Sequence, residues 1–315
     1  MNTSEQFNNQ AEKGPRLILH IERGKVWKFE ELPSKSIALD GAVEGPEVDA
    51  GNQRFSFDHH DKCVRLVTSA TCEQVKDALL LGLETDGCNV YINDIDGDTV
   101  MAYVLLKHPE LARDPVVQEL VEVVGKVDAH GPAYPTRNPK LADAFYLGPL
   151  KRVSDLHRSK KYSETDLTQL LEECSAGTLE LIEKMRRGEG LATREEKERT
   201  FEITYTGTGW IMAKSDDFVF DLLYAAGHTR AIAYQELSDG SFRYTVGKKS
   251  EIVGDFPVGP ASKEGTILHA LNDREPGWGG GSSIGGSPRN QDGSSSRLSP
   301  DEVAAIVAET IARDK

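Results

Sequence analysis

Long apolar runs are missing from this sequence. No segment approaches the roughly eighteen consecutive apolar residues that indicate a membrane span. The first residues, Met1 to Pro15, are polar and lack the basic and then apolar segments of a secretory signal. We therefore expect a cytoplasmic protein with no membrane partner, in which residues 1–15 form a disordered lead-in.

Cysteine is scarce, and no two cysteines show C-x-x-C spacing. This absence argues against a zinc knuckle and against a thioredoxin-type pair. Because cytosolic proteins keep their thiols reduced, we expect buried free cysteines. The four cysteines are Cys63, Cys72, Cys88 and Cys174.

Positive charge is also in short supply. The chain has 37 Lys and Arg against 51 Asp and Glu, which gives a net charge of −14. A surface that binds long duplex nucleic acid needs clustered basic residues, so we do not expect that partner. The sequence also lacks the G-x-x-x-x-G-K-[ST] loop of nucleotide-driven motors and the G-x-S-x-G elbow of acyl transfer.

The sequence has enough residues, 315, for two domains. In the first half, short apolar runs alternate with helical patterns, which predicts an α/β domain with a mostly parallel sheet over residues 16–160. The expected strands are Leu17–Ile21, Ser36–Asp40, Arg54–Asp58 and Val90–Asp94. The expected helices are Cys72–Leu83, Thr99–Lys107 and Pro115–Lys126.

A long helical pattern runs from Glu164 to about Arg187, with Ser163 as its expected cap. We interpret residues 161–199 as a helical linker, followed by a smaller α+β domain over residues 200–315. A helix capped by Ser215 and a final helix that opens with a capping box at Ser299 are expected there. The expected strands are Phe201–Tyr205, Trp210–Lys214, Arg230–Gln235 and Phe242–Val246, the last two joined at Asp239-Gly240.

Acidic residues end three of the strands predicted in the first half. Asp40, Asp58 and Asp94 each follow an apolar run. Because ligands collect at the carboxyl ends of strands in open α/β sheets, these side chains are expected to share one crevice if the strands are parallel neighbours. Further Asp and His residues lie close by in the sequence; they are His59, His60, Asp96, Asp98, Asp128 and His130.

This set of residues predicts a metal centre. Carboxylates so close together repel one another unless a cation or proton intervenes. Mixed carboxylate and imidazole ligands suit Mn²⁺, and an all-oxygen subset would accept Mg²⁺. The number of candidate ligands favours two ions, which together can activate a water for in-line attack on phosphorus. Each short motif alone is more typical of a turn or a surface cluster, and their joint occurrence favours the metal site.

A glycine-rich run spans Gly277–Arg289 and allows two interpretations. Its backbone amides, serine hydroxyls and arginine could bind a phosphate, or the run could be a flexible linker. Trp278, Ile284 and Pro288 are atypical of linkers and favour the phosphate site. The candidate substrate-binding residues are Gly279, Gly280, Gly281, Ser282, Ser283, Gly285, Gly286 and Arg289, together with His130.

The motif Asp58-His59-His60 resembles the signature of the DHH phosphoesterase superfamily. The segment Val90 to Thr99, a strand that ends in D-x-D-G before a helix, resembles another motif of that family, and Asp40 or Asp49 matches its lone Asp. The glycine-rich run resembles the motif of the family's C-terminal DHHA1 domain. Here the DHH motif precedes the D-x-D-G motif, the reverse of the family's order.

The resemblance implies a metal-dependent hydrolase of a phosphoester or phosphoanhydride, with a nucleotide or short oligonucleotide as substrate. It implies that Asp58 and His60 are catalytic, with His60 as a second ligand or a proton donor. The metal ligands would be Asp40, Asp58, His59, Asp94, Asp96, Asp98 and Asp128. Two alternatives stay open, a non-catalytic nucleotide sensor and a structural metal protein, and a second copy of the chain is a further candidate partner.

Overall fold

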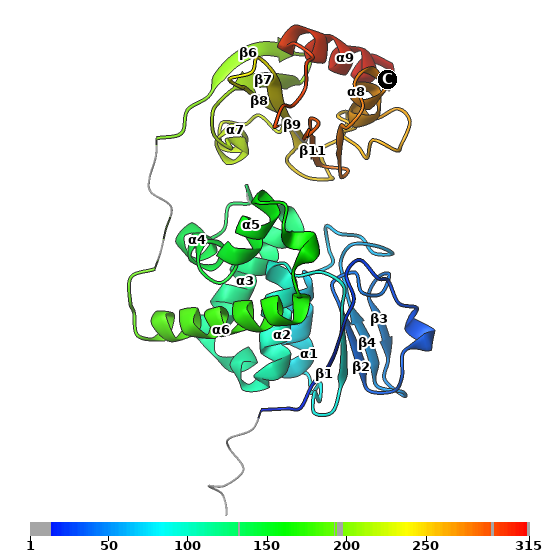
Figure 1. Cartoon of the computed structure of the whole chain (residues 1–315), viewed down its shortest axis with the longest axis vertical. Helices are drawn as coiled ribbons and strands as arrows, with labels where there is room; N and C mark the ends of the chain where they lie inside the picture. Colours follow the sequence, from blue (N-terminus) through cyan, green and yellow to red (C-terminus); the bar gives the residue numbers. More distant parts are fainter. Residues whose placement is uncertain (1–13, 132, 192, 194–197, 291–292, 314–315) are drawn as a thin grey trace, which may run out of the picture. The chain divides into compact units, whose positions relative to one another are not determined.

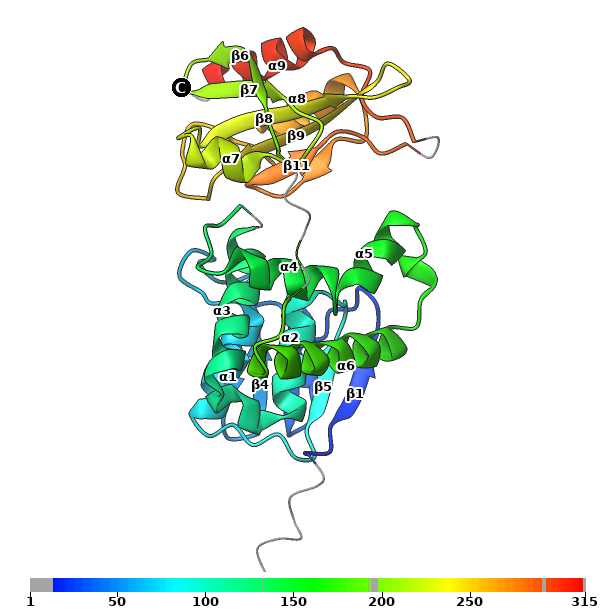
Figure 2. The same ribbon diagram turned by 90° about the vertical axis from the view of Figure 1, so that its left-hand side faces the viewer.

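The computed structural model describes residues 14–131, 133–191, 193, 198–290 and 293–313. The predicted lead-in over residues 1–15 falls almost entirely outside them. The chain divides into two compact units, Met1–Glu195 and Glu196–Lys315, which Figures 1 and 2 show from two sides. Each unit has its own sheet and its own buried core.

The sheet of the first unit is mostly parallel, as the sequence predicts. Its strands lie in the order β1-β5-β2-β4-β3, and only the edge strand β3 runs antiparallel to its neighbour. The central strand β2 is buried along its whole length. The strands are β1 (Ile18–Ile21), β2 (Ser36–Leu39), β3 (Glu47–Asp49), β4 (Arg54–Phe57) and β5 (Asn89–Ile92).

Helices cover one face of this sheet (Figures 1 and 2). Helix α2 lies at the centre of the layer, and its residues are buried from Gly97 to Leu106. The helices are α1 (Thr71–Leu80), α2 (Gly97–Lys107), α3 (Pro115–His130), α4 (Pro139–Leu147), α5 (Lys151–Arg158) and α6 (Leu167–Arg186). Short 3-10 helices are η1 (Phe29–Glu31), η2 (Pro109–Arg113) and η3 (Tyr162–Glu164).

Helix α6 packs into the core of the first unit. Leu170, Leu171 and Ile182 are buried in the same cluster as the residues of α2 and α3. The helix that the sequence suggests as a linker therefore forms part of the first unit. Its N-cap is Asp166, which accepts hydrogen bonds from two backbone amides of the first turn, and the expected cap at Ser163 is wrong.

The second unit is built on a six-stranded mixed sheet in the order β10-β11-β9-β8-β7-β6. The hairpin predicted at Asp239-Gly240 joins the antiparallel strands β8 and β9. The strands are β6 (Glu202–Gly207), β7 (Trp210–Lys214), β8 (Arg230–Glu236), β9 (Phe242–Lys248), β10 (Gly279–Gly280) and β11 (Ile284–Gly286). The helices are α7 (Phe220–Ala225), α8 (Ile267–Arg274) and α9 (Pro300–Arg313).

The predicted helix starts of this unit have different outcomes. The capping box at Ser299 is confirmed, since its backbone amide donates to Glu302 and the Glu302 amide donates back to its hydroxyl. Helix α7 does not begin at Ser215, because the Ser215 hydroxyl donates to the carbonyl of Thr200 and the helix starts only at Phe220.

The glycine-rich run forms an ordered hairpin of strands β10 and β11, with β11 paired to β9. Its glycines allow close packing: a Cβ on Gly285 would lie 2.3 Å from Leu268 Cδ1, and one on Gly280 would lie 2.3 Å from Gly285 Cα. The flexible-linker interpretation does not describe this part of the chain.

The four cysteines are free thiols, as expected, and Cys72, Cys88 and Cys174 are buried. Within the described residues, no helix combines the length and the apolar character that crossing a membrane requires.

Candidate metal centre

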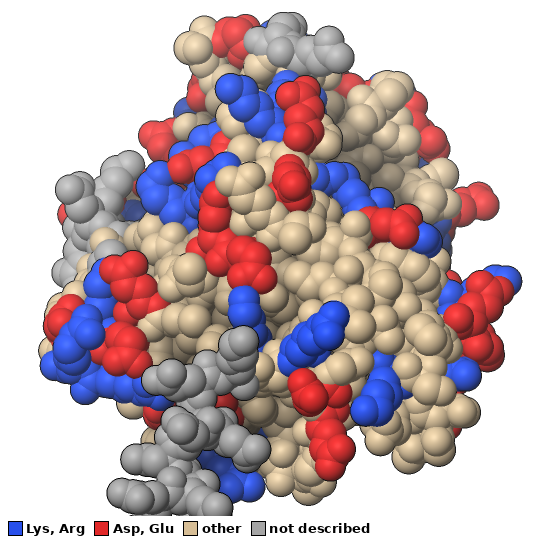
Figure 3. Space-filling view, turned by 60° about the horizontal axis from the view of Figure 1, so that its bottom comes forward, with Lys and Arg blue, Asp and Glu red and all other residues tan. Residues whose placement is uncertain are grey.

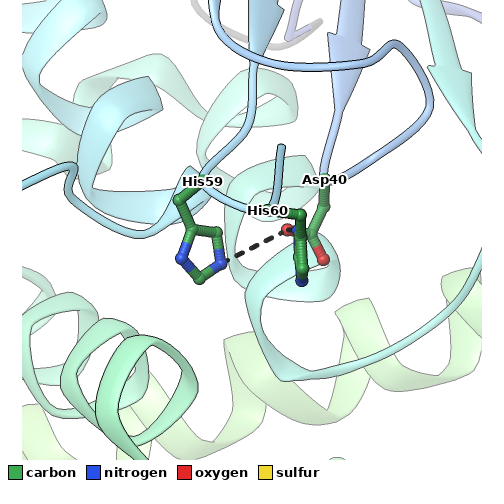
Figure 4. Close-up of side chains that lie close together, drawn as sticks. All are labelled: Asp40, His59 and His60. Atoms are coloured by element: carbon green, nitrogen blue, oxygen red, sulfur yellow. Dashed lines mark ion pairs between the residues drawn. The ribbon is translucent and has the colours of Figure 1, made fainter. Parts of the chain in front are cut away.

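The site lies where three neighbouring parallel strands of the first unit end. Strands β5, β2 and β4 are adjacent, and acidic or histidine residues follow each of them. Asp40, directly after β2, has a φ of +49°. This left-handed conformation is uncommon for a residue other than glycine, and such backbone strain is concentrated at functional sites. Figure 4 shows Asp40 beside the two histidines that follow β4.

His59 lies at the centre of the cluster. Its Nε2 atom lies 2.8 Å from Asp128 Oδ2, 3.6 Å from Asp98 Oδ2 and 3.7 Å from Asp40 Oδ1. These atoms form two groups that could hold a metal ion: Asp40, His59 and His60 form one, and His59, Asp98 and Asp128 form the other. His59 belongs to both.

Both ring nitrogens of His59 are buried, and neither has a hydrogen-bond partner among the residues that the structure describes. The 2.8 Å contact with Asp128 is close enough for a hydrogen bond, but its direction does not meet hydrogen-bond geometry. Buried polar atoms are rarely left unpaired, because desolvation without a partner costs about 1–3 kcal/mol. A cation among the three carboxylates would give Nε2 a ligand to coordinate.

Two carboxylates are held in place by groups that lie far away in the sequence. Asp98 accepts hydrogen bonds from the backbone amides of Thr71 and Cys72 at the start of α1, both at 2.7 Å. Asp40 accepts one from the Thr71 hydroxyl at 3.0 Å. The N-terminal end of α1 therefore fixes the orientation of both carboxylates.

The carboxylates disfavour one another's charge. Burial, together with Asp128 and Asp96, raises the pKa of Asp98 to about 7. Burial raises the pKa of Asp40 well above its usual value, and Asp96, Asp98 and Asp128 add to the shift. Such a cluster is stable at neutral pH only with bound protons or with a cation that offsets the repulsion.

Asp58 has a different environment. Its carboxylate accepts hydrogen bonds from the Gly45 amide, the His60 amide and His60 Nδ1, the last at 2.9 Å. Although burial raises the pKa of Asp58, these bonds lower it to about 2. Asp58 thus orients the partly exposed His60 ring and belongs to neither of the two groups.

The acidic side chains that follow β5 contact different partners. Asp98 enters the cluster, and Asp96 contacts Asp40 while capping α2 through the amide of Thr99. The exposed Asp94 instead accepts a hydrogen bond from the Tyr162 hydroxyl and lies outside both groups. Asp49, the alternative to Asp40, lies in edge strand β3 and binds Asn52.

The predicted substrate-binding residues lie in two places. His130 ends α3, close to Asp128, and its ring stacks on Tyr134 at 4.9 Å. The others belong to the hairpin of the second unit, where the Ser282 hydroxyl donates to Glu251 and Arg289 is exposed. Both metal-candidate groups lie wholly in the first unit.

The sequence alone does not reveal several contributors. Thr71 and Thr99 donate hydroxyl hydrogen bonds to Asp40, and Tyr146 of α4 lies beside the Asp96–Asp98 turn. The one available signal was the position of Thr71 at the start of a predicted helix, where free amides can bind a carboxylate.

The donor set fits a divalent cation. Buried Asp and His side chains converge within coordination range of one another, and an unpaired imidazole lies among them. No family model matches the chain, and no curated protein matches it.

Proposed function

We propose that the chain is a divalent-metal-dependent phosphoesterase that hydrolyses a phosphoester or phosphoanhydride of a nucleotide or short oligonucleotide. The observation that carries the proposal is the buried Nε2 of His59, which has no hydrogen bond within the described part of the chain and lies within 3.7 Å of carboxylate oxygens from Asp40, Asp98 and Asp128. Such a site is costly to fold unless a cation occupies it.

The carboxylates around His59 would hold two ions. His59 Nε2 has a single lone pair and would bind one ion together with Asp98 and Asp128. Asp40 would bind the other ion, and His60 would stay free of metal. Mixed oxygen and nitrogen donors suit Mn²⁺ better than Mg²⁺, which prefers oxygen. Bound there, the ions would supply charge stabilisation at phosphorus and an activated water.

His60 would donate a proton to the leaving oxygen. Its ring is more exposed than that of His59, so a substrate can reach it. The hydrogen bond from its Nδ1 to Asp58 raises the pKa of His60, and burial only partly opposes that shift. The hydrogen-bonded pair of His60 and Asp58 therefore keeps a proton available near neutral pH, where a general acid is most effective.

Arg65 is an exposed arginine whose charge acts on His60 and His130. Its positive charge acts against protonation of both rings, although the Asp58 hydrogen bond still raises the pKa of His60 and burial is the main cause of the lowered pKa of His130. Within the described part of the chain, Arg65 makes no ion pair. A guanidinium without a partner is well suited to contact a phosphate.

The surface favours a small substrate. On the face shown in Figure 3, described Lys and Arg side chains stand among Asp and Glu instead of forming one continuous basic band. Long nucleic acid binds by neutralising many phosphates, and this mixed surface offers little for that.

The test begins with protein stripped of metal by EDTA and reloaded with Mn²⁺ or Mg²⁺. Hydrolysis of bis-p-nitrophenyl phosphate and release of phosphate from nucleotides would then be measured. We expect Mn²⁺-dependent turnover that His59→Ala abolishes. The matched control is His108→Ala, because His108 follows the opposite end of α2 and contacts Glu110.

Other results would point to the alternatives. Mn²⁺ binding without turnover, with nucleotides raising the melting temperature, would favour the sensor. Unfolding on metal removal, with no effect of nucleotides, would favour a structural metal site.

A further inference from the structure

Helix α4 places a tyrosine against the acidic turn. A Cβ on Gly97, between Asp96 and Asp98, would lie 2.9 Å from the Tyr146 hydroxyl oxygen and 3.2 Å from Phe145 Cε1. The buried Phe145 meets the Tyr146 ring edge-on, with centroids 5.4 Å apart. Phe145 therefore holds the ring in place, and glycine at position 97 lets the hydroxyl approach the backbone between two acidic residues.

The Tyr146 hydroxyl has no hydrogen-bond partner among the described residues. Tyr146 is only half-buried, so a substrate can reach its side chain.

The neighbouring carboxylates already have other donors. Both oxygens of Asp98 accept backbone amides of α1, and Asp96 Oδ1 accepts the amide of Thr99. Burial raises the pKa of Tyr146 well above its usual value, with Asp128, Asp96 and Asp98 adding to the effect. The phenol therefore stays protonated at neutral pH, and its proton has no acceptor among the described residues.

We propose that Tyr146 is a catalytic residue whose hydroxyl donates a hydrogen bond to a phosphoryl oxygen of the substrate beside the Asp96–Asp98 turn. This inference rests on the proposed function, because it needs a phosphoryl group at the cluster. No covalent step involves the phenol, which keeps its proton throughout. A fixed donor of this kind is worth on the order of 100-fold in kcat.

The test compares full-length wild type with Tyr146→Phe, which removes only the hydroxyl. Tyr103→Phe is the matched control, because its hydroxyl binds Glu172 instead of the acidic cluster. Three quantities would be measured on Mn²⁺-loaded protein: kcat for bis-p-nitrophenyl phosphate, Kd for inorganic phosphate by calorimetry, and Mn²⁺ content. The melting temperature would confirm folding.

We expect Tyr146→Phe to lower kcat about 100-fold and to weaken phosphate binding, with Mn²⁺ content and melting temperature unchanged. Equal phosphate affinity in Tyr146→Phe and wild type would overturn the inference even if the wild type hydrolyses the ester. If the wild type has no turnover, weaker phosphate binding by Tyr146→Phe still supports the contact, while the proposed function fails. A wild type that binds no phosphate overturns the inference.

Discussion

The Nδ1 atom of His60 lies 2.9 Å from Oδ1 of Asp58, and this contact shifts the pKa of both groups in opposite directions. The carboxylate stays charged to about pH 2, and the imidazole keeps its proton to a higher pH than an isolated histidine. A carboxylate behind an imidazole fixes both the orientation and the proton affinity of the ring.

Replacing that carboxylate should move the pH profile. A proton donor with a raised pKa is active below that pKa, and its activity is lost as the pH rises through it. Asp58→Asn removes the negative charge but keeps an acceptor for the Gly45 amide, so the pKa of His60 should fall. We expect the basic limb of the kcat profile to shift to lower pH. An unmoved basic limb in Asp58→Asn would exclude His60 as the proton donor.

Bound metal should offset a loss of stability that the metal-free protein shows as the pH rises. The pKa of Asp98 is raised from 3.8 to about 7 in the folded chain, so the folded state binds this proton more tightly than the unfolded state. The resulting stability is full at low pH and is lost as the pH rises towards 7. In EDTA, the melting temperature should therefore fall over this range, and saturating Mn²⁺ should restore it.

The control for this prediction is Asp98→Asn, because the asparagine side chain does not titrate. Its melting temperature in EDTA should depend less on pH than that of the wild type. Equal slopes in the two proteins would show that Asp98 does not carry the effect.

Replacing Arg65 should weaken substrate binding more than it slows the hydrolysis step. We expect Arg65→Gln to raise KM for a phosphodiester about tenfold, because a charge-assisted hydrogen bond contributes about 1.5–3 kcal/mol. Arg158→Gln is the control, since Arg158 is exposed and pairs with Asp155. An unchanged KM in Arg65→Gln would remove this residue from the substrate site.

Much of the fold follows from the sequence, but the metal cluster follows only in part. The strands that precede Asp40, Asp58 and Asp94 could be predicted, because apolar runs are local features of the sequence. Which carboxylate turns inward could not, since it depends on distant partners: Asp94 binds Tyr162, and Asp98 binds the amides at the start of α1. The approach of Tyr146 to this cluster could not be predicted for the same reason.

The glycine-rich hairpin needs its own test, because its glycines have a packing role. Gly285→Ala should cost about 1–3 kcal/mol of stability, since the new methyl would overlap Leu268. Gly279→Ala is the matched control, with nothing within 4 Å of its Cβ. Thermal unfolding of the two variants measures the difference. If Gly279→Ala instead weakens phosphate binding without loss of stability, the hairpin binds substrate.

The location of bound Mn²⁺ decides whether the cluster around His59 is a metal site. Crystals grown with Mn²⁺ would be measured at a wavelength where manganese scatters anomalously. We expect an anomalous peak about 2.0–2.6 Å from His59 Nε2 and from oxygens of Asp98 and Asp128. A fully occupied peak elsewhere, with the His59 ring still unliganded, would contradict it.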